Sequence, residues 1–260
     1  MRFLRGILFL GVLSYGLAAA AAYWGQGRML YAPDGKLLSD CALPEGVEVW
    51  NAGIEQGLLS DANNDNLLLF FHGNAGSACN WRYLGVNHAV KFGFDVLVLE
   101  YPGYGGDART PGKIEIESGL KTLAAWVEAQ NYTRITVMGY SLGTGVAGLY
   151  AQDYGADQVI LFAPFDSVYS VALSQGVAFP RALLREDFDN MQTLAAVSAP
   201  ITIIHGADDV VIPAEHSLQL QEHLTANGRD VRREVRTAVG HYGLFENPGF
   251  DTFLKHTLQP

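Results

Sequence analysis

Residues 134–145 have the sequence RITVMGYSLGTG. An apolar strand pattern, Ile135–Met138, runs directly into Gly139-Tyr140-Ser141-Leu142-Gly143, and a helical pattern begins at Leu142. A G-x-S-x-G motif between a strand and a helix is typical of a nucleophile elbow, a turn so sharp that the residues two before and two after the serine must be small. We therefore predict that Ser141 is a nucleophile whose hydroxyl projects above the sheet edge.

The same stretch carries a competing motif. Residues 143–148, GTGVAG, match the G-x-G-x-x-G loop of nicotinamide-dependent enzymes, and Asp166 lies about 20 residues further on, where such an enzyme needs an acid. That loop places its first glycine in the turn that leaves the strand, and here Gly139 and Ser141 occupy this turn. The small residues are better explained by close packing of the helix on the sheet. A turn with an incidental serine is the simplest alternative.

Apolar runs recur on both sides of the motif. Two opening strands are expected at Val47–Trp50 and Ile54–Leu59, and further strands at Asn66–Phe71, Phe94–Leu99, Gln158–Phe162, Ile201–Ile204 and Glu234–Val239. Helical patterns alternate with them at Ile114–Gln130, Leu142–Gln152 and Tyr242–Leu258. This alternation predicts an α/β doubly wound fold with a mostly parallel central sheet flanked by helices. Ligands of such sheets bind beyond the carboxyl ends of the strands.

One histidine is placed to serve as a general base. His241 follows the last predicted strand within Gly240-His241-Tyr242-Gly243, where the glycines leave room for its ring. His72 and His205 each precede a glycine at a strand end and are expected to brace loops. The remaining histidines fall within helical patterns and are expected at the surface; they are His88, His216, His223 and His256.

The acid is expected in the loop after Ile201–Ile204. Asp208 and Asp209 both qualify by type, and Asp209 is better placed because it leads into the apolar run Val210–Pro213. Asp166, after the preceding strand, is a third option. The resulting chain order of serine, aspartate and histidine is that of the α/β-hydrolases.

A glycine-rich loop can supply the oxyanion hole. Residues 72–76, HGNAG, follow the first long apolar strand. We predict that the amides of Leu142 and Asn74 bind the oxyanion, with Ala75 as the fallback donor.

The N-terminus differs from the rest of the chain. Residues 1–24 carry Arg2 and Arg5 before an uncharged apolar run, Gly6–Ala22, which predicts a membrane anchor or a cleaved signal peptide with small-residue cleavage sites. The arginines favour a catalytic domain on the non-cytoplasmic side, periplasmic or extracellular, or a secreted one after cleavage. A connector is expected over residues 25–44 and one domain over 45–260.

Charge and cysteine content exclude several functions. A formal net charge of −10 argues against a nucleic-acid partner, which needs clustered cations. Two cysteines, Cys41 and Cys79, are too few for a disulfide framework or a zinc site. The simplest interpretation of Cys79 is a small buried side chain, whereas a Cys41–Cys79 bridge is an alternative for an exported domain. Neither is expected to be a nucleophile.

Several motifs together resemble a known family. FFHGNAG (70–76), EYPGYG (100–105), GYSLG (139–143), HGADDVVIP (205–213) and GH (240–241) resemble the BEM46-like α/β-hydrolases, which include ABHD13-type and ABHD17-type proteins. The resemblance implies the α/β-hydrolase fold, a triad of Ser141, Asp209 and His241, and no metal or organic cofactor. Some relatives remove fatty-acyl groups from protein cysteines, but the cysteine-rich N-terminus of those relatives is absent here.

A lid segment is expected over residues 165–199, with one or two short helices. Its apolar residues suit either an acyl-binding wall or packing on the sheet; they are Val171, Leu173, Val177, Phe179, Leu183 and Leu184. The sequence thus predicts a serine hydrolase acting on a carboxylic ester or thioester, acyl or lipid-like, through a covalent acyl-enzyme. A peptidase of the same fold and a catalytically silent binding protein are the alternatives.

Overall fold

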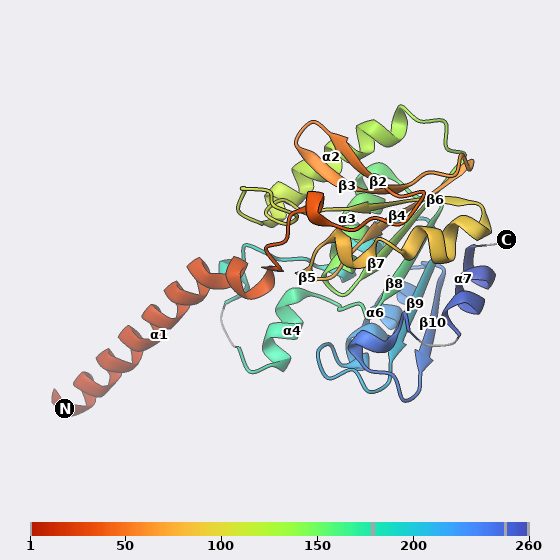
Figure 1. Ribbon diagram of the computed structural model, residues 1–260. Helices are drawn as coiled ribbons and strands as arrows, with labels where there is room; N and C mark the ends of the chain where they lie inside the picture. The colour runs from red at the N-terminus through yellow and green to blue at the C-terminus, as the bar shows by residue number, and fades with distance from the viewer. Residues whose placement is uncertain (1, 178–179, 247–248, 259–260) are drawn as a thin grey trace.

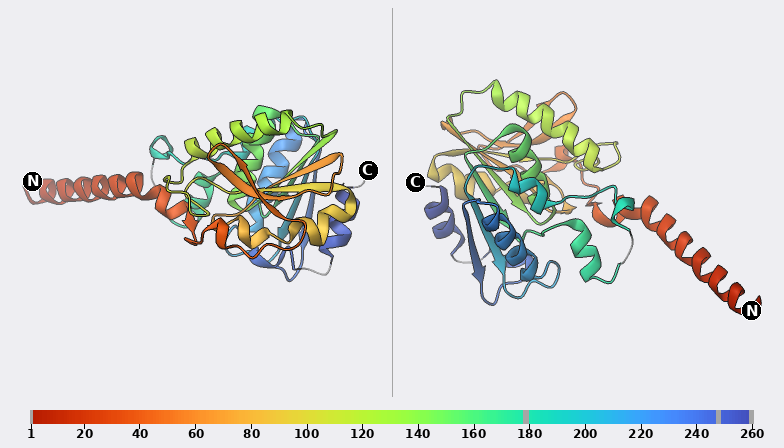
Figure 2. Two further views of the ribbon diagram at one scale, coloured as in Figure 1. Left: turned by 45° about the horizontal axis from the view of Figure 1, so that its top comes forward. Right: turned by 180° about the vertical axis from the view of Figure 1, so that it is seen from behind.

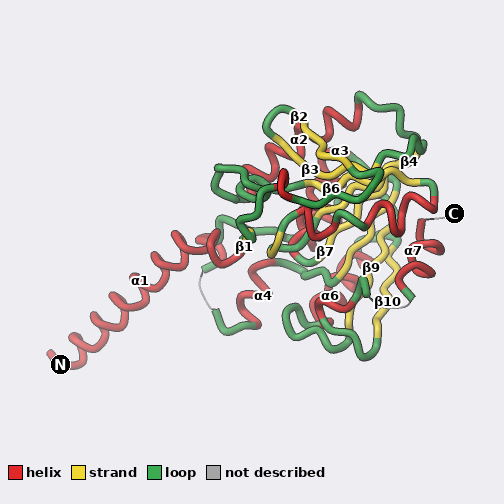
Figure 3. The backbone as a smooth tube through the Cα atoms, viewed as in Figure 1, coloured by secondary structure: helices red, strands yellow, loops and turns green. Residues whose placement is uncertain are grey.

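The central element of the protein is a twisted sheet (Figure 1; Figure 3). The computed structural model describes residues 2–177, 180–246 and 249–258, and within them the large sheet has eight strands in the order β10-β9-β8-β7-β4-β6-β3-β2. All neighbours run parallel except at β3, which pairs antiparallel with β2 and β6. The strands are β2 Glu48–Ala52, β3 Glu55–Ser60, β4 Asn66–Phe71, β6 Phe94–Leu99, β7 Arg134–Tyr140, β8 Gln158–Phe162, β9 Ile201–Gly206 and β10 Val231–Arg236.

Apolar side chains fill both faces of the sheet. Because side chains alternate along a strand, Leu67, Leu69 and Phe71 of β4 belong to one apolar cluster while Leu68 and Phe70 belong to the other. The first cluster packs beneath α2 Lys113–Glu128, α3 Leu142–Tyr154, α5 Asn190–Ala195 and α6 Ala214–Ala226. The second packs beneath the short turns η2 Ala78–Trp81, η3 Gly85–Ala89 and η4 Val90–Phe92 and the final helix α7 Phe250–Leu258. The predicted α/β class with a mostly parallel sheet is confirmed.

The N-terminal segment is a single helix, α1 Arg2–Leu30, which projects away from the domain in every view (Figures 1 and 2). It continues to Leu30, beyond the predicted segment 1–24. Across the part of the chain that the structure describes, no helix combines the length and apolar character that a membrane crossing requires. The expected membrane-spanning segment is therefore not supported. After α1, a short strand, β1 Ala32–Pro33, pairs in parallel with β5 Ala75–Gly76.

The connector is attached to the domain covalently. Cys41, just after the turn η1 Leu38–Asp40, forms a disulfide with Cys79 of η2. The favoured sequence interpretation of Cys79 as an unpaired buried side chain is therefore wrong, and the alternative bridge is present. Sequence reasoning could not decide this point, because the pairing depends on how the connector folds back over η2.

Two predicted element boundaries at the C-terminal end are wrong. The last strand is Val231–Arg236 rather than 234–239, since its register with β9 ends at Arg236 opposite Gly206. The chain then turns through Ala238, whose φ is +57°. The expected single helix 242–258 is instead the short turn η6 His241–Gly243 followed by α7.

The segment expected as a lid, residues 165–199, contains α4 Val168–Ser174, the turn η5 Arg181–Leu183 and α5. We call its described part before α5 the cap. Phe179, which was expected on its apolar side, lies outside the described residues. The C-terminal end of α1 lies beside this cap (Figure 2).

Candidate active site

The turn between β7 and α3 has the geometry of a nucleophile elbow. Ser141 has a φ of +54° and a ψ of −120°, a conformation that a residue with a side chain adopts only under strain. The flanking glycines make the turn sterically feasible. A Cβ on Gly143 would collide with the carbonyl oxygen of Phe71, and one on Gly139 with the carbonyl oxygen of Gly143.

The structure brings the three predicted catalytic residues together. His241 Nε2 lies 3.1 Å from Ser141 Oγ, and His241 Nδ1 lies 2.6 Å from Asp209 Oδ2. All three residues are buried, between 5% and 7% exposed. They come from three separate strand ends, after β7, after β9 and after β10, whose carboxyl ends lie along one edge of the sheet.

Asp209 is held as a carboxylate. Burial by itself raises the pKa of its carboxyl, but hydrogen bonds from His205, His241 and the Ile212 amide outweigh that effect and hold the pKa well below its usual range. Its Oδ1 accepts from the amides of Val211 at 2.9 Å and Ile212 at 2.8 Å. The carboxylate is therefore fixed in both charge and direction.

This arrangement defines the proton positions on His241. An ionised Asp209 only accepts hydrogen bonds, so Nδ1 of His241 donates its proton to it. The Nε2 lone pair then faces the Ser141 hydroxyl, which is the tautomer needed to remove the proton of that hydroxyl. The three groups can therefore produce a nucleophilic serine.

The other acid candidates have different positions. Asp208 is exposed at the surface. Asp166 is buried and bonds Nδ1 of His216 at 2.9 Å. His216 is itself buried, so its predicted place at the surface is wrong: it lies near the start of α6, where Asp166 meets it across the loop after β8.

The loop predicted to form the oxyanion hole faces the elbow. Gly73 packs against Tyr140 and Ser141, with no room for a larger side chain to be added without displacing the Tyr140 ring. Within the described chain, neither the Asn74 amide nor the Leu142 amide donates a hydrogen bond to another residue. Asn74 and Ser141 line the same cavity, so both amides are free to bind a substrate oxygen there.

A buried polar network holds this loop, and sequence reasoning assigned it no role. The Tyr104 hydroxyl donates to the carbonyl of Asn74 at 2.6 Å, and the Tyr101 hydroxyl donates to the carbonyl of His72 at 2.7 Å. Glu100 accepts from the Ala78 amide and faces Nε2 of His72 at 3.2 Å. The sequence signal for this network is the motif EYPGYG (100–105), which directly follows β6.

The predicted loop-bracing histidines are confirmed as such. His72 bridges Gly73 and Glu100, and it is fully buried. His205 Nε2 donates to the carbonyl of Ile212 at 2.8 Å and lies 3.3 Å from Asp209. His205 thus supports the acid of the site without touching the serine.

Ser141 opens into a cavity of about 260 Å³. Its lining is mainly aliphatic, and most of these side chains come from the end of α1, the cap and the loop after Asp209. They include Met29, Leu30, Val168, Val171, Val177 and Val211, while Gln26, Asn74 and Gln175 add polar groups. An uncharged acyl group attached to Ser141 would find apolar contacts here.

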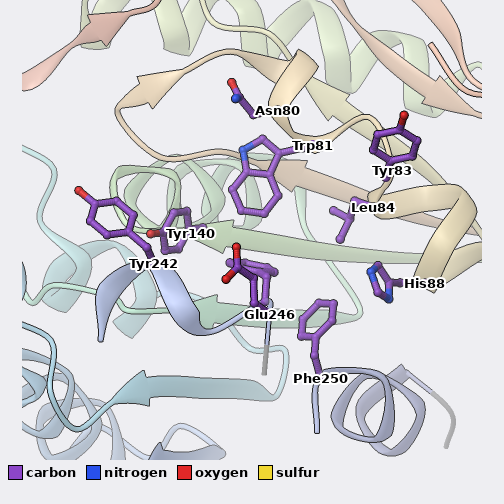
Figure 4. A pocket seen from close by; sticks show the side chains of 10 residues that line it. Asn80, Trp81, Tyr83, Leu84, His88, Tyr140, Tyr242, Glu246 and Phe250 are labelled. Atoms are coloured by element: carbon purple, nitrogen blue, oxygen red, sulfur yellow. The ribbon is translucent and has the colours of Figure 1, made fainter. Parts of the chain in front are cut away.

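A second cavity, of about 440 Å³, lies between η2–η3 and α7 and does not include Ser141. Figure 4 shows Trp81 between Tyr140 and Leu84, with Glu246 and Phe250 on the opposite side. The ring of Tyr140 lines this second cavity, and its hydroxyl donates to the carbonyl of His241 at 3.1 Å.

The α/β-hydrolase class is defined by the order of the sheet, by the elbow and by a serine, a histidine and an aspartate joined by hydrogen bonds. Comparisons with known proteins agree with this class. A family model described as alpha/beta hydrolase fold matches residues 66–174. Relatives of 26–28% identity include ABHD12, ABHD12B and ABHD17B proteins, so the comparisons support the predicted ABHD-type α/β-hydrolase family.

Individual relatives are distant. An uncharacterized protein of Mycobacterium tuberculosis is 31% identical over 180 residues, which are 67% of this chain and 62% of that protein. The lysophosphatidylserine lipase ABHD12 of rat is 26% identical over 179 residues, 58% of this chain and 44% of the lipase. The chain thus spans less than two thirds of the length of these relatives. An esterase of Pyrococcus furiosus shares the fold, with a TM-score of 0.65 at 18% identity, covering 88% of this chain and 95% of the esterase.

Proposed function

We propose that the protein hydrolyses carboxylic esters or thioesters with an apolar acyl group, using Ser141, His241 and Asp209 as a catalytic triad. One observation carries the proposal: a strained serine bonded to a carboxylate-oriented imidazole opens into an aliphatic cavity. The ABHD-type relatives, one of them named as a lipase, support it.

The residues have distinct roles in this mechanism. His241 takes the proton of Ser141 as Oγ bonds to the carbonyl carbon of the substrate, and the carbonyl electron pair moves onto oxygen. The amides of Asn74 and Leu142 donate to that oxyanion. His241 then gives its proton to the departing alcohol or thiol, which leaves an acyl-Ser141 ester. Water, deprotonated by the same imidazole, attacks the acyl carbon. The bond between this carbon and Oγ then breaks, His241 returns the proton to Oγ, and the acid departs.

The alternatives receive less support. An aminopeptidase needs a carboxylate for the substrate amine, and among the described residues that line the Ser141 cavity none is acidic. A silent binding protein would have no need for a serine held in a strained conformation against a general base.

Labelling with a fluorophosphonate probe tests the nucleophile. We expect Ser141→Ala to fold normally and to lose labelling, while the matched control Ser174→Ala, altered on the exposed face of α4, labels at the wild-type rate. Persistent labelling of Ser141→Ala would refute the assignment.

A substrate panel of esters, thioesters and peptides tests the reaction class. We expect turnover of esters and thioesters with aliphatic acyl groups and none of peptides. If acetate esters outpace longer acyl esters by orders of magnitude, the acyl-binding role of the cavity is wrong.

We further propose that the domain works outside the cytoplasm, brought there by its N-terminal segment and held at a lipid surface. The Cys41–Cys79 disulfide supports export, because disulfides persist in oxidising compartments. The apolar side chains that α1 exposes support lipid contact, among them Phe9, Leu10 and Leu17. Fractionation with N-terminal sequencing of the mature protein tests this: recovery in the cytoplasm would contradict it, and a secreted chain lacking the N-terminal segment would contradict lipid attachment.

A further inference from the structure

The end of α1 reaches the catalytic cavity. Met29 and Leu30, in its last turn, line the same cavity as Ser141, and Val168 and Val171 of α4 line it as well. Leu30 packs on the apolar core, whereas Met29 is 69% exposed. The helix that projects from the domain therefore contributes apolar surface to the site.

Hydrogen bonds fasten this helix end to the cap. Gln26 is buried, and its Oε1 accepts from the amides of Arg185 at 2.6 Å and Glu186 at 3.1 Å. Its Nε2 donates to the carbonyl of Leu183 at 3.2 Å. One side-chain amide thus satisfies three backbone groups of the cap, which fixes the helix end relative to it.

The two residues that follow α1 add further attachments, one to the cap and one to the oxyanion loop. The Tyr31 hydroxyl donates to Glu186 at 2.8 Å, and the same carboxylate oxygen accepts from the Lys113 amide. One residue further, the Ala32 amide donates to the carbonyl of Asn74 at 3.0 Å. The end of α1 is therefore held between the cap and the oxyanion loop.

From this placement we propose that the last turn of α1 is a wall of the acyl-binding site, and that Met29 and Leu30 determine which aliphatic acyl chains the enzyme accepts. The inference rests on the proposed esterase function and adds specificity-determining residues to it. At about 260 Å³ the cavity lies just below the usual range for ligand sites, about 300–1,000 Å³, so each added methylene must find room against this wall. A wall of aliphatic side chains discriminates by size and not by charge.

Two substitutions in the full-length chain test the wall. Leu30→Trp and Met29→Trp each add bulk at the cavity, and kcat/KM is measured for p-nitrophenyl esters from acetate to dodecanoate. We expect the preferred acyl chain to become shorter, with kcat/KM for the longest accepted esters falling about tenfold or more and that for acetate staying within about twofold. The reciprocal variant Met29→Ala should move the preference to longer chains.

Leu17→Trp is the matched control, because Leu17 is exposed on the same helix, about 2.5 turns before Gln26, the first residue of α1 among those that line the cavity. Fluorophosphonate labelling at the wild-type rate identifies variants whose triad is intact, and Met29, being largely exposed, tolerates replacement without unfolding. If labelled Met29→Trp and Leu30→Trp keep the wild-type chain-length profile, or if Leu17→Trp shifts it equally, the wall assignment is wrong while the triad stands. If the wild-type protein itself does not react with the fluorophosphonate, the proposed function is wrong.

Discussion

The two sides of the catalytic cavity are built in different ways. On the sheet side, each predicted catalytic residue lies within a few positions of a strand end, and Asp209 is fixed by amides two and three residues away. On the other side, the wall joins segments far apart in the chain, since Gln26 bonds Leu183 across 157 residues and Tyr31 bonds Glu186 across 155. The chemistry is thus encoded locally, whereas the shape of the cavity depends on tertiary contacts.

The largest expected effect tests the sheet side. Asp209→Asn keeps the volume but can no longer fix the tautomer of His241, so we expect kcat/KM for an ester substrate to fall by about 10⁴-fold. Steady-state kinetics measure this. Asp208→Asn, next door but exposed, should stay within twofold of wild type. If Asp166→Asn loses most of its activity while Asp209→Asn stays active, the acid lies in the loop after β8 and the assignment to Asp209 is wrong.

The next effect concerns how the connector is attached to the sheet side. Replacing both Cys41 and Cys79 by serine opens a loop with a sequence separation of 38. The chain-entropy model gives a loss of about 4 kcal/mol in the free energy of unfolding. Urea unfolding measures it, and fluorophosphonate labelling of the folded fraction should be unchanged. An unaltered unfolding midpoint would show that the bridge does not stabilise the domain.

A smaller effect tests the junction between the two sides. The Tyr104 hydroxyl donates to the carbonyl of Asn74 and accepts from the Ala32 amide at 3.1 Å. Without it the oxyanion loop is less well positioned, so we expect Tyr104→Phe to lower kcat about tenfold at nearly constant KM. Tyr83→Phe, at a half-exposed ring, is the control. A change confined to KM would mean that the hydroxyl serves substrate binding instead.

The smallest effect concerns Asp166, which lies between β8 and α4, where the chain enters the cap. Burial favours a raised pKa for Asp166, but hydrogen bonds from His216, the Ser167 amide and Ser170 lower the pKa below its usual value. A depressed pKa stabilises the fold above the unfolded pKa of about 3.9, and this contribution is lost as the pH falls toward the folded value. The difference in Tm between wild type and Asp166→Asn should therefore shrink between pH 6 and pH 3. A constant difference would exclude this linkage.

The contrast between the two sides explains what the sequence could predict. The strands, the elbow and the positions of Ser141, Asp209 and His241 follow from short motifs, because glycines and strand periodicity act over a few residues. Burial of His216 against Asp166, the Cys41–Cys79 bridge and the place of Gln26 at the cap depend on contacts across 38 to 160 residues. Local patterns carry no record of these contacts, so the sequence alone predicts an exposed His216 and a connector at the end of α1.

The pairing of β1 with β5 has a mechanical consequence. It involves only Ala32 and Pro33 against Ala75 and Gly76, yet it adjoins the Asn74 carbonyl. Tension applied along α1, for example by a surface to which the helix adheres, would load the hydrogen bonds of Gln26 and Tyr31 and then this two-residue ladder before it loaded any strand of the large sheet. Hydrolysis would then slow under a pulling force too weak to unfold the domain.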